Sequence, residues 1–152
     1  MKAKKILITG RAGFIGSNLV HEHLTKGYEV TVLDNLSPQI HGLSPDTTSP
    51  LFNSIKEKVN FICGDVTNRS DWEKALVDIE IVVHLAAETG TGQSMYEIYD
   101  YINVNIGGTA LLLDFITNNK TSVKKVLIAS SRAIYGEGKY FSAELGIIFP
   151  DL

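Results

Sequence analysis

The sequence has very little cysteine, no excess of positive charge and no long hydrophobic run. Each of these absences excludes a class of protein. The single cysteine, Cys63, rules out an internal disulfide, which fits a reducing compartment such as the cytosol. A net charge of −3 gives no electrostatic basis for binding nucleic acid or an anionic membrane. No segment approaches the roughly 18 consecutive apolar residues of a membrane-spanning helix.

Other absences argue against particular kinds of catalytic or metal site. The sequence contains no Gly-x-Ser-x-Gly turn, so it does not predict a hydrolase of that kind. The histidines are scattered, and His21 and His23 would point to different faces of one predicted helix, so no metal site is predicted. Cys63 lies in the strand-like run VNFIC, where a small buried side chain is expected rather than a catalytic thiol.

The apolar residues that are present, 44% of 152, are enough for the core of one domain, residues 1–152. Short apolar runs predict buried strands, and helical spacing or capping residues predict helices between them. The expected strands are residues 5–9, 29–34, 59–63, 79–86 and 125–129, and the expected helices are residues 14–24, 51–58, 68–77 and 95–118. This alternation predicts an α/β fold, a Rossmann-type doubly wound parallel sheet with helices on both faces.

Two segments fall outside this alternation. Residues 35–50 hold three of the four prolines together with Ser, Thr and Gly, and are expected to form a long irregular loop. The last residues, FSAELGIIFPDL, complete no further strand–helix unit, so the sheet is expected to be truncated after its fifth strand. Strand 125–129 would then be an unprotected apolar edge, which favours self-association.

The first strand runs directly into TGRAGFIG, which places Gly10, Gly13 and Gly16 at the start of the first helix. This arrangement is typical of a dinucleotide-binding turn. The first glycine allows the tight turn, the second leaves room for a pyrophosphate, and the third lets helix and strand pack closely. The free N–H groups at the start of the helix would attract the phosphates.

Asp34 ends the second strand, where a carboxylate can accept hydrogen bonds from both ribose hydroxyls of an adenosine. It would repel the 2′-phosphate of NADP, and LDNLSPQ contains no Arg or Lys to bind that phosphate, so the sequence favours NAD. After the third strand, GDVTN places Asp65 and Val66 at the same edge of the sheet, where an adenine would lie. A purely structural Asp65 that caps the next helix is the alternative.

Together, TGRAGFIG, LDNLS, GDVTN, VVHLAA, NVNIGGT and ASSRAIYG resemble the extended short-chain dehydrogenase/reductase family, specifically its NAD-dependent nucleotide-sugar epimerases and dehydratases. The resemblance runs from Lys5 to about Lys139 and implies a Rossmann domain that holds NAD. It also implies a smaller C-terminal region that binds the nucleotide sugar, which this chain is expected to lack. Because the family often pairs through the helices of this region, the apolar helix around ALLLDFI could form a homodimer face, although core packing is the simpler expectation.

The resemblance also assigns roles to the matching residues. Those expected to line the pyrophosphate are Gly10, Arg11, Ala12, Gly13, Phe14, Ile15 and Gly16. Those expected at the adenosine are Asp34 and Asn35 for the ribose and Asp65 and Val66 for the adenine. Those expected around the nicotinamide half are Leu85, Ala86, Ala87, Thr89, Ser130 and Asn105, the last of which orders the strand ends. Ser131 aligns with the family's catalytic Ser or Thr, which hydrogen-bonds the reacting sugar oxygen.

Two departures from the family pattern limit which of the family's reactions the residues of this chain could support. The resemblance implies that dehydratases carry an Asp–Glu pair directly after the catalytic Thr, whereas this chain has Arg132 and Ala133, so the sequence does not predict a dehydratase of that type. Tyr135 and Lys139 have the spacing of the family's catalytic Tyr-x-x-x-Lys, but the two glycines between them oppose the helix that this pair requires. The family's pair would fall just past Leu152.

Three functions follow from these expectations. In the first, the chain is the NAD-binding part of a nucleotide-sugar epimerase, which moves a hydride at a sugar carbon through NAD, and is inactive alone. In the second, it is a non-catalytic dinucleotide-binding domain. In the third, it is a regulatory module that binds NAD and a protein partner.

Overall fold

The computed structural model describes residues 4–10, 12–131, 134 and 138–149. Its centre is a parallel sheet of five strands in the order β3-β2-β1-β4-β5. The strands are β1 (Lys5–Thr9), β2 (Glu29–Asp34), β3 (Asn60–Cys63), β4 (Ile81–His84) and β5 (Lys125–Ile128). The chain order reverses between β1 and β4, which is the switch point of a doubly wound Rossmann sheet, as predicted.

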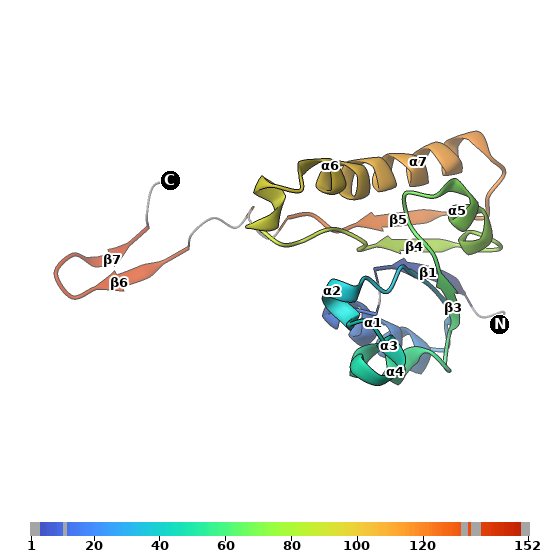
Figure 1. Ribbon diagram of the computed structural model, residues 1–152, viewed down its shortest axis with the longest axis horizontal. Coiled ribbons are helices and arrows are strands. Elements are labelled where there is room, and N and C mark those ends of the chain that lie inside the picture. The colour runs from blue at the N-terminus through green and yellow to red at the C-terminus, as the bar shows by residue number, and fades with distance from the viewer. Residues whose placement is uncertain (1–3, 11, 132–133, 135–137, 150–152) are drawn as a thin grey trace.

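Helices cover both faces of this sheet (Figure 1). One face carries α1 (Phe14–Thr25) and α4 (Pro50–Ile55), and the other carries α5 (Arg69–Ala75) and α7 (Thr109–Asn118). The 3₁₀ turn η1 (Gln93–Met95), α6 (Ile98–Tyr101) and the π-helical η2 (Ile102–Gly108) lead into α7, so the expected helical segment is largely confirmed. In the described part of the chain, no helix is long and apolar enough to cross a membrane.

Strand β1 shows how the sheet organises two cores. Successive side chains of a strand point to opposite faces, so Leu7 joins the cluster around Trp72 of α5. Its neighbours Ile6 and Ile8 join Val20 of α1 on the other face. All five side chains are at most 1% exposed. Burying each of the large apolar ones contributes roughly 1.5–3 kcal/mol to folding, which fixes β1 at the centre.

Two helix boundaries follow the sequence signals. Gly27 adopts φ +76° just past the end of α1, and its N–H donates to the carbonyl of Leu24 at 3.0 Å. This is the left-handed position that glycine occupies without strain. At the start of α5, the side chain of Asn68 accepts the N–H of Ser70 at 3.0 Å and caps the helix, as expected.

The expectation of an irregular loop over residues 35–50 was wrong. Two short helices form there, α2 (Pro38–His41) and α3 (Pro45–Thr48), and α4 begins at Pro50. Each helix starts with proline directly after a serine at the N-cap position, namely Ser37, Ser44 and Ser49. Proline suits the first helical position because its fixed φ is helical and its missing N–H would have no partner there. Three Ser–Pro pairs therefore mark helix starts in what looked like a loop.

The sheet ends at β3 on one side and β5 on the other. On β5, Leu127 is 43% exposed and Ile128 is 48% exposed, so the apolar edge is present as expected. Cys63, at the end of β3, is exposed, which corrects the expectation that it is buried. The C-terminal residues form an antiparallel hairpin of β6 (Tyr140–Ser142) and β7 (Gly146–Ile148), which lies away from the sheet in Figure 1.

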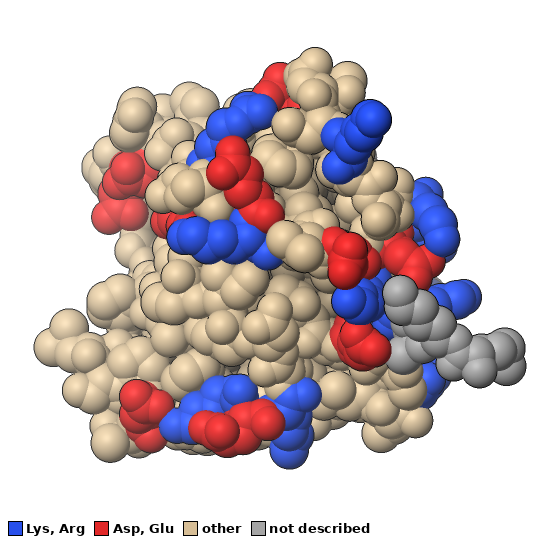
Figure 2. Space-filling view, turned by 90° about the vertical axis from the view of Figure 1, so that its right-hand side faces the viewer, with Lys and Arg blue, Asp and Glu red and all other residues tan. Residues whose placement is uncertain are grey.

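The face near the amino ends of the strands carries both signs of charge, as Figure 2 shows. At this edge Lys5 pairs with Glu29 and Asp78, and Lys124 pairs with Glu80 at 2.6 Å. Surface pairs of this kind contribute at most about 1 kcal/mol each. Because the charges are interleaved, this face offers no patch of one sign for a charged ligand.

Candidate functional site

The opposite edge of the sheet collects residues predicted to bind the cofactor. Gly10 follows β1, Asp34 ends β2, Asp65 follows β3, Leu85 follows β4 and Ser130 follows β5. In doubly wound sheets, ligands bind outside the carboxyl ends of the strands at the switch point. The structure therefore brings these residues to the edge where a dinucleotide would lie, and the role of each one stays a prediction.

The turn after β1 requires glycine at its first position. Gly10 adopts φ +68°, and its N–H donates to the carbonyl of Leu33 on β2 at 3.0 Å. A Cβ atom at Gly10 would lie 2.5 Å from the Cα of Ala86, in the loop after β4. Only glycine lets these two segments come so close. The predicted pyrophosphate turn and the predicted nicotinamide loop thus touch each other.

The first turn of α1 lies at this edge. Gly13 is the N-cap residue, and Gly16 is buried inside the helix, as the glycine pattern predicts. Phe14 and Ile15, both predicted at the pyrophosphate, are 76% and 65% exposed. The first N–H groups of a helix have no partner within it and favour an anion there. Arg11, also predicted at the pyrophosphate, lies outside the described residues.

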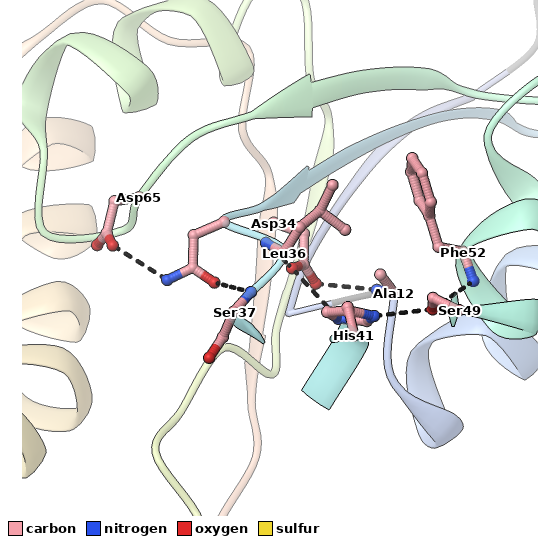
Figure 3. A network of polar contacts seen from close by, with 9 residues as sticks. Ala12, Asp34, Leu36, Ser37, His41, Ser49, Phe52 and Asp65 are labelled. Atoms are coloured by element: carbon pink, nitrogen blue, oxygen red, sulfur yellow. Dashed lines mark hydrogen bonds and ion pairs between the residues drawn. The ribbon is translucent and has the colours of Figure 1, made fainter. Parts of the chain in front are cut away.

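Asp34 is held by the backbone on both sides of its carboxylate (Figure 3). Its Oδ2 accepts the N–H of Ala12 at 2.9 Å, and its Oδ1 accepts the N–H of Leu36 at 2.8 Å. The side chain is only 7% exposed. A carboxylate can accept about four hydrogen bonds, so two positions remain beside those that these N–H groups occupy. Those positions can receive the two hydroxyls of a ribose.

Asn35 and Asp65, predicted at neighbouring parts of an adenosine, contact each other. The Nδ2 of Asn35 donates to Oδ2 of Asp65 at 3.2 Å, and both the N–H and the hydroxyl of Thr67 donate to Oδ1. Burial opposes ionisation of Asp65, but these hydrogen bonds outweigh it and lower the pKa of its carboxyl group. Asp65 is therefore an anchored carboxylate rather than the cap of α5, a role that Asn68 fills.

Asp71 supports this corner and was not predicted. Its Oδ2 accepts the N–H of Asp65 at 3.0 Å, and its Oδ1 accepts Nζ of Lys74 at 2.9 Å. The hydrogen bond from Lys74, followed by that from the N–H of Asp65, lowers the pKa of the Asp71 carboxyl group. A Cβ at Gly64 would lie 2.8 Å from the Asp71 carboxyl carbon, so the segment before Asp65 packs directly on it. An acidic residue in the first turn of a helix was the available sequence signal.

Val66, predicted to meet the adenine, is fixed from two sides. Its carbonyl accepts Nε1–H of Trp72 at 2.7 Å. Its side chain lies against Gly108, where an added Cβ would be 2.8 Å from Cγ2 of Val66. The glycine at the end of η2 therefore admits Val66 into the space between the sheet and α7.

Thr9 and His84, at the carboxyl ends of β1 and β4, hold the start of the predicted nicotinamide loop. The Oγ1 of Thr9 accepts the N–H groups of Leu85 and Ala86, each at 3.2 Å. Its own proton then goes to Nδ1 of His84 at 2.7 Å, which leaves the ring proton on Nε2. Burial lowers the pKa of His84 to about 4, and Nε2 has no hydrogen-bond partner among the described residues. His84 is thus neutral at neutral pH, beside the ring of Trp72.

Asn105 contacts the same loop from η2. Its amide binds the backbone of Glu88 through both the N–H, at 2.8 Å, and the carbonyl, at 3.0 Å. The two predicted residues on either side of Glu88, Ala87 and Thr89, are exposed. Asn105 therefore holds the loop after β4 from a π-helical turn of the kind that often occurs at functional sites, and its role beside the cofactor stays a prediction.

The segment after β5 carries the predicted catalytic residue. Ser130 and Ser131 are exposed and follow β5 at the carboxyl edge of the sheet. The catalytic role of Ser131 stays a prediction, and Arg132, Ala133 and Tyr135 lie outside the described residues. Lys139 lies just before β6 and not in a helix, which agrees with the expectation that the nearby Tyr-x-x-x-Lys spacing is not the catalytic pair.

The two helical histidines are used within the fold. His21 Nε2 lies 3.1 Å from the hydroxyl of Ser54, and His23 Nδ1 lies 2.7 Å from the carbonyl of Leu19. Over the described ranges, the structure contains no group of three or more His, Cys, Asp and Glu side chains that could hold a metal ion.

Comparison with known proteins gives one consistent result. The model of the NAD dependent epimerase/dehydratase family matches residues 6–146. The dTDP-L-rhamnose 4-epimerase of Burkholderia thailandensis is 42% identical over 149 residues, which are 97% of this chain and 40% of that protein. The structure of UDP-glucose 4-epimerase from Brucella ovis in complex with NAD has a TM-score of 0.70 and 30% identity, over 88% of this chain and 38% of that one.

A third relative is UDP-N-acetylglucosamine 4-epimerase from Methanobrevibacter ruminantium. Its structure has a TM-score of 0.69 and 36% identity, over 91% of this chain and 41% of that one. The chain therefore spans 38–41% of the length of these relatives.

Proposed function

We propose that this chain, which belongs to the NAD dependent epimerase/dehydratase family, forms the NAD-binding part of a nucleotide-sugar epimerase. The relatives described above support this proposal because their names are those of nucleotide-sugar 4-epimerases, and one was solved with NAD. Because the chain spans only 38–41% of their length, the activity of the whole protein is part of the proposal. We place the region that binds the nucleotide sugar beyond residue 152.

The observation that carries the proposal is the anchoring of Asp34. Two backbone N–H groups, from Ala12 and Leu36, fix its carboxylate at the end of β2 and leave acceptor positions for two hydroxyls. A ribose with free 2′- and 3′-hydroxyls satisfies both positions, whereas a 2′-phosphate would bring two negative charges together. The site therefore favours NAD over NADP.

The other predicted residues would contact different parts of the dinucleotide. The first turn of α1 would receive the pyrophosphate, and Asp65 with Val66 would flank the adenine. Thr9 and Asn105 fix the loop after β4, along which the nicotinamide half would lie. Bound NAD would supply the hydride acceptor and donor for the sugar carbon. Ser131 would hydrogen-bond the reacting sugar oxygen.

Elimination of water is not part of the proposed reaction. Arg132 and Ala133 stand where the dehydratases of the family have an acid/base pair, and neither side chain can take and return a proton as a carboxylate does. Epimerisation needs hydride transfer in both directions but no such pair, so the side chains that follow Ser131 favour it.

We also infer that the whole protein is a cytosolic homodimer. The single free Cys63 is exposed, which suits a reducing compartment. Exposed apolar side chains gather along α6, η2 and α7, at Ile98, Ile102, Ile106 and Leu113. Several exposed apolar side chains along one helical segment are typical of a subunit contact, whereas the inward side of α7, with Leu112 and Phe115, belongs to the core.

Calorimetric titration of this chain with NAD and with NADP tests the cofactor proposal. We expect NAD to bind more tightly, and Asp34→Ala to weaken NAD by about tenfold or more because hydrogen bonds to a charged acceptor are lost. Asp46→Ala is the matched control, since the Asp46 side chain is 75% exposed and belongs to α3. Equal affinity of the wild-type chain for both dinucleotides would contradict the role given to Asp34.

A second candidate function is a dinucleotide-binding module without catalysis of its own. It is favoured by the position of Lys139 before a strand, which leaves the described part of the chain without a helical Tyr–Lys pair. Turnover of labelled UDP- or dTDP-sugars by this chain and by a form extended to the full length of the relatives separates the two candidates. Activity of the extended form alone supports the epimerase, and inactivity of both forms supports the binding module.

A further inference from the structure

The short helices after β2 fold back onto Asp34. His41, the last residue of α2, is only 4% exposed, and its Nε2 lies 3.9 Å from Oδ1 of Asp34 (Figure 3). The carbonyl of His41 accepts the hydroxyl of Thr48, which joins the end of α2 to α3. Segment 35–50 thus brings an imidazole against the carboxylate proposed to bind the ribose.

The other ring nitrogen determines where the proton of His41 lies. The Nδ1 of His41 is 2.9 Å from Oγ of Ser49, the N-cap residue of α4, and this oxygen also accepts the N–H of Phe52. The hydroxyl accepts that N–H, so its single proton is available to donate to Nδ1. In the tautomer in which Nδ1 accepts the Ser49 hydroxyl, the ring carries its proton on Nε2, which faces Asp34. A chain of contacts therefore runs from the first turn of α4 through Ser49 and His41 to the Asp34 carboxylate.

A buried imidazole in this position is not explained by packing alone. An apolar side chain would fill the same space without the cost of burying two ring nitrogens. At 3.9 Å the contact from Nε2 to Oδ1 is too long for a hydrogen bond and is an electrostatic attraction between an N–H dipole and a negative charge. It adds an attraction from His41 to the two hydrogen bonds that Asp34 accepts from the N–H groups of Ala12 and Leu36.

We propose that His41 is a positioning residue for dinucleotide recognition, which keeps the Asp34 carboxylate turned so that its free acceptor positions face the adenosine ribose. This inference rests on the proposed binding of NAD. If Asp34 can rotate, it loses attraction for the 2′-hydroxyl and also repulsion of a 2′-phosphate. His41 therefore acts on the choice between NAD and NADP, and not only on the stability of segment 35–50.

Two substitutions distinguish the contribution of Nε2 of His41 from that of Nδ1. His41→Gln extends an amide to the place of Nε2 and keeps a donor near Asp34, whereas His41→Asn reaches only the place of Nδ1 and keeps the contact with Ser49. We expect His41→Asn to weaken NAD about fivefold at about pH 8 while NADP changes less, so that the preference for NAD falls. His41→Gln should keep most of the preference.

Calorimetry of this chain with both dinucleotides, alongside thermal unfolding of each variant, decides the question. An equal loss of affinity for NAD and NADP in both variants would show a merely structural His41 and overturn the inference, as would an unchanged preference in His41→Asn. If the wild-type chain binds neither dinucleotide, the proposed function fails and the inference fails with it.

A second variant keeps the test decisive if His41→Asn does not fold. Ser49→Ala leaves the imidazole in place but removes the hydroxyl that sets its tautomer. We expect its preference for NAD to fall by about twofold to threefold. A folded Ser49→Ala protein with the full wild-type preference would contradict the proposal.

Discussion

The side-chain amide of Asn105 makes two hydrogen bonds with the backbone of Glu88, one as acceptor and one as donor, as a paired strand residue does. The Oδ1 accepts the Glu88 N–H at 2.8 Å, and Nδ2 donates to the Glu88 carbonyl at 3.0 Å, although the two residues are 17 positions apart. The loop after β4 is thereby joined to η2 and kept beside the carboxyl ends of β1 and β4.

Asn105→Asp should destabilise the protein by about 1–3 kcal/mol, because a carboxylate would face the Glu88 carbonyl with no proton to donate. Urea unfolding measures the change in the free energy of unfolding. Asn103→Asp is the control, because it introduces the same charge into the same helical segment. Equal losses in the two variants would show that charge, and not the contact with Glu88, is responsible.

Substitution of the adjacent glycines Gly107 and Gly108 in η2 by alanine should change the stability of the protein in opposite directions. A Cβ at Gly108 would lie 2.8 Å from Cγ2 of Val66, whereas a Cβ at Gly107 would meet its nearest atom, Oδ1 of Asn103, at 3.4 Å. We expect Gly108→Ala to cost about 1–3 kcal/mol of stability through overpacking, and Gly107→Ala to be neutral or to stabilise by up to about 1 kcal/mol. Denaturant unfolding of both variants tests this.

Combining Gly108→Ala with Val66→Ala checks the cause. Removal of the Val66 methyl groups makes room for the new Cβ, so the double variant should be more stable than the sum of the single effects predicts. Strict additivity would mean that the cost of Gly108→Ala arises elsewhere in the helix.

Stability should fall with acid in a window set by His84. The pKa of His84 is lowered by burial from 6.5 to about 4 in the folded protein. The unfolded chain therefore takes up a proton near pH 6.5 that the folded protein accepts only near pH 4. The free energy of unfolding decreases as the pH falls between these values, by up to about 3 kcal/mol from this group.

His84→Asn isolates that contribution, because its amide oxygen can still accept the hydroxyl of Thr9 but does not titrate. We expect the variant to lose less stability than the wild type between about pH 6.5 and pH 4, measured by urea unfolding across the range. Parallel curves for the two proteins would show that His84 is not the group responsible.

Two apolar surfaces should contribute separately to self-association. Ile102 is 51% exposed on η2, and Leu127 is 43% exposed on the edge strand β5. If the proposed dimer forms through η2, we expect Ile102→Lys to weaken it by about tenfold or more, because a charge would be buried in the contact. Leu127→Lys should suppress larger assemblies that grow from the edge. Sedimentation velocity over a range of concentrations distinguishes these, and a wild-type chain that stays monomeric throughout would contradict both.

The sequence patterns predicted the fold better than the contacts of the site. Short apolar runs located the strands, because a strand buried on both faces of a parallel sheet has few polar positions. The prolines of segment 35–50 predict a loop if they act only as helix breakers, but each follows a serine and begins a helix. Cys63 was expected to be buried because nothing in VNFIC shows that β3 lies at the edge of the sheet.

Within the site, the predictable residues were those with a fixed place in a motif. Gly10 and Asp34 belong to a turn and a strand end with known geometry. The sequence does not predict Thr9 and His41, because each contacts a partner that lies far away in the sequence or belongs to a helix that the pattern does not indicate. Such contacts depend on how segments meet in space, which spacing along one sequence does not reveal.

The single tryptophan of the chain makes the adenine corner observable without any label. Trp72 is fully buried, donates its Nε1–H to the carbonyl of Val66 and lies beside His84. All indole fluorescence of the chain therefore arises directly beneath the proposed adenine position. Emission from this one ring responds to movement of Val66 and to the charge on the neighbouring imidazole, so the protein carries its own optical reporter of that corner.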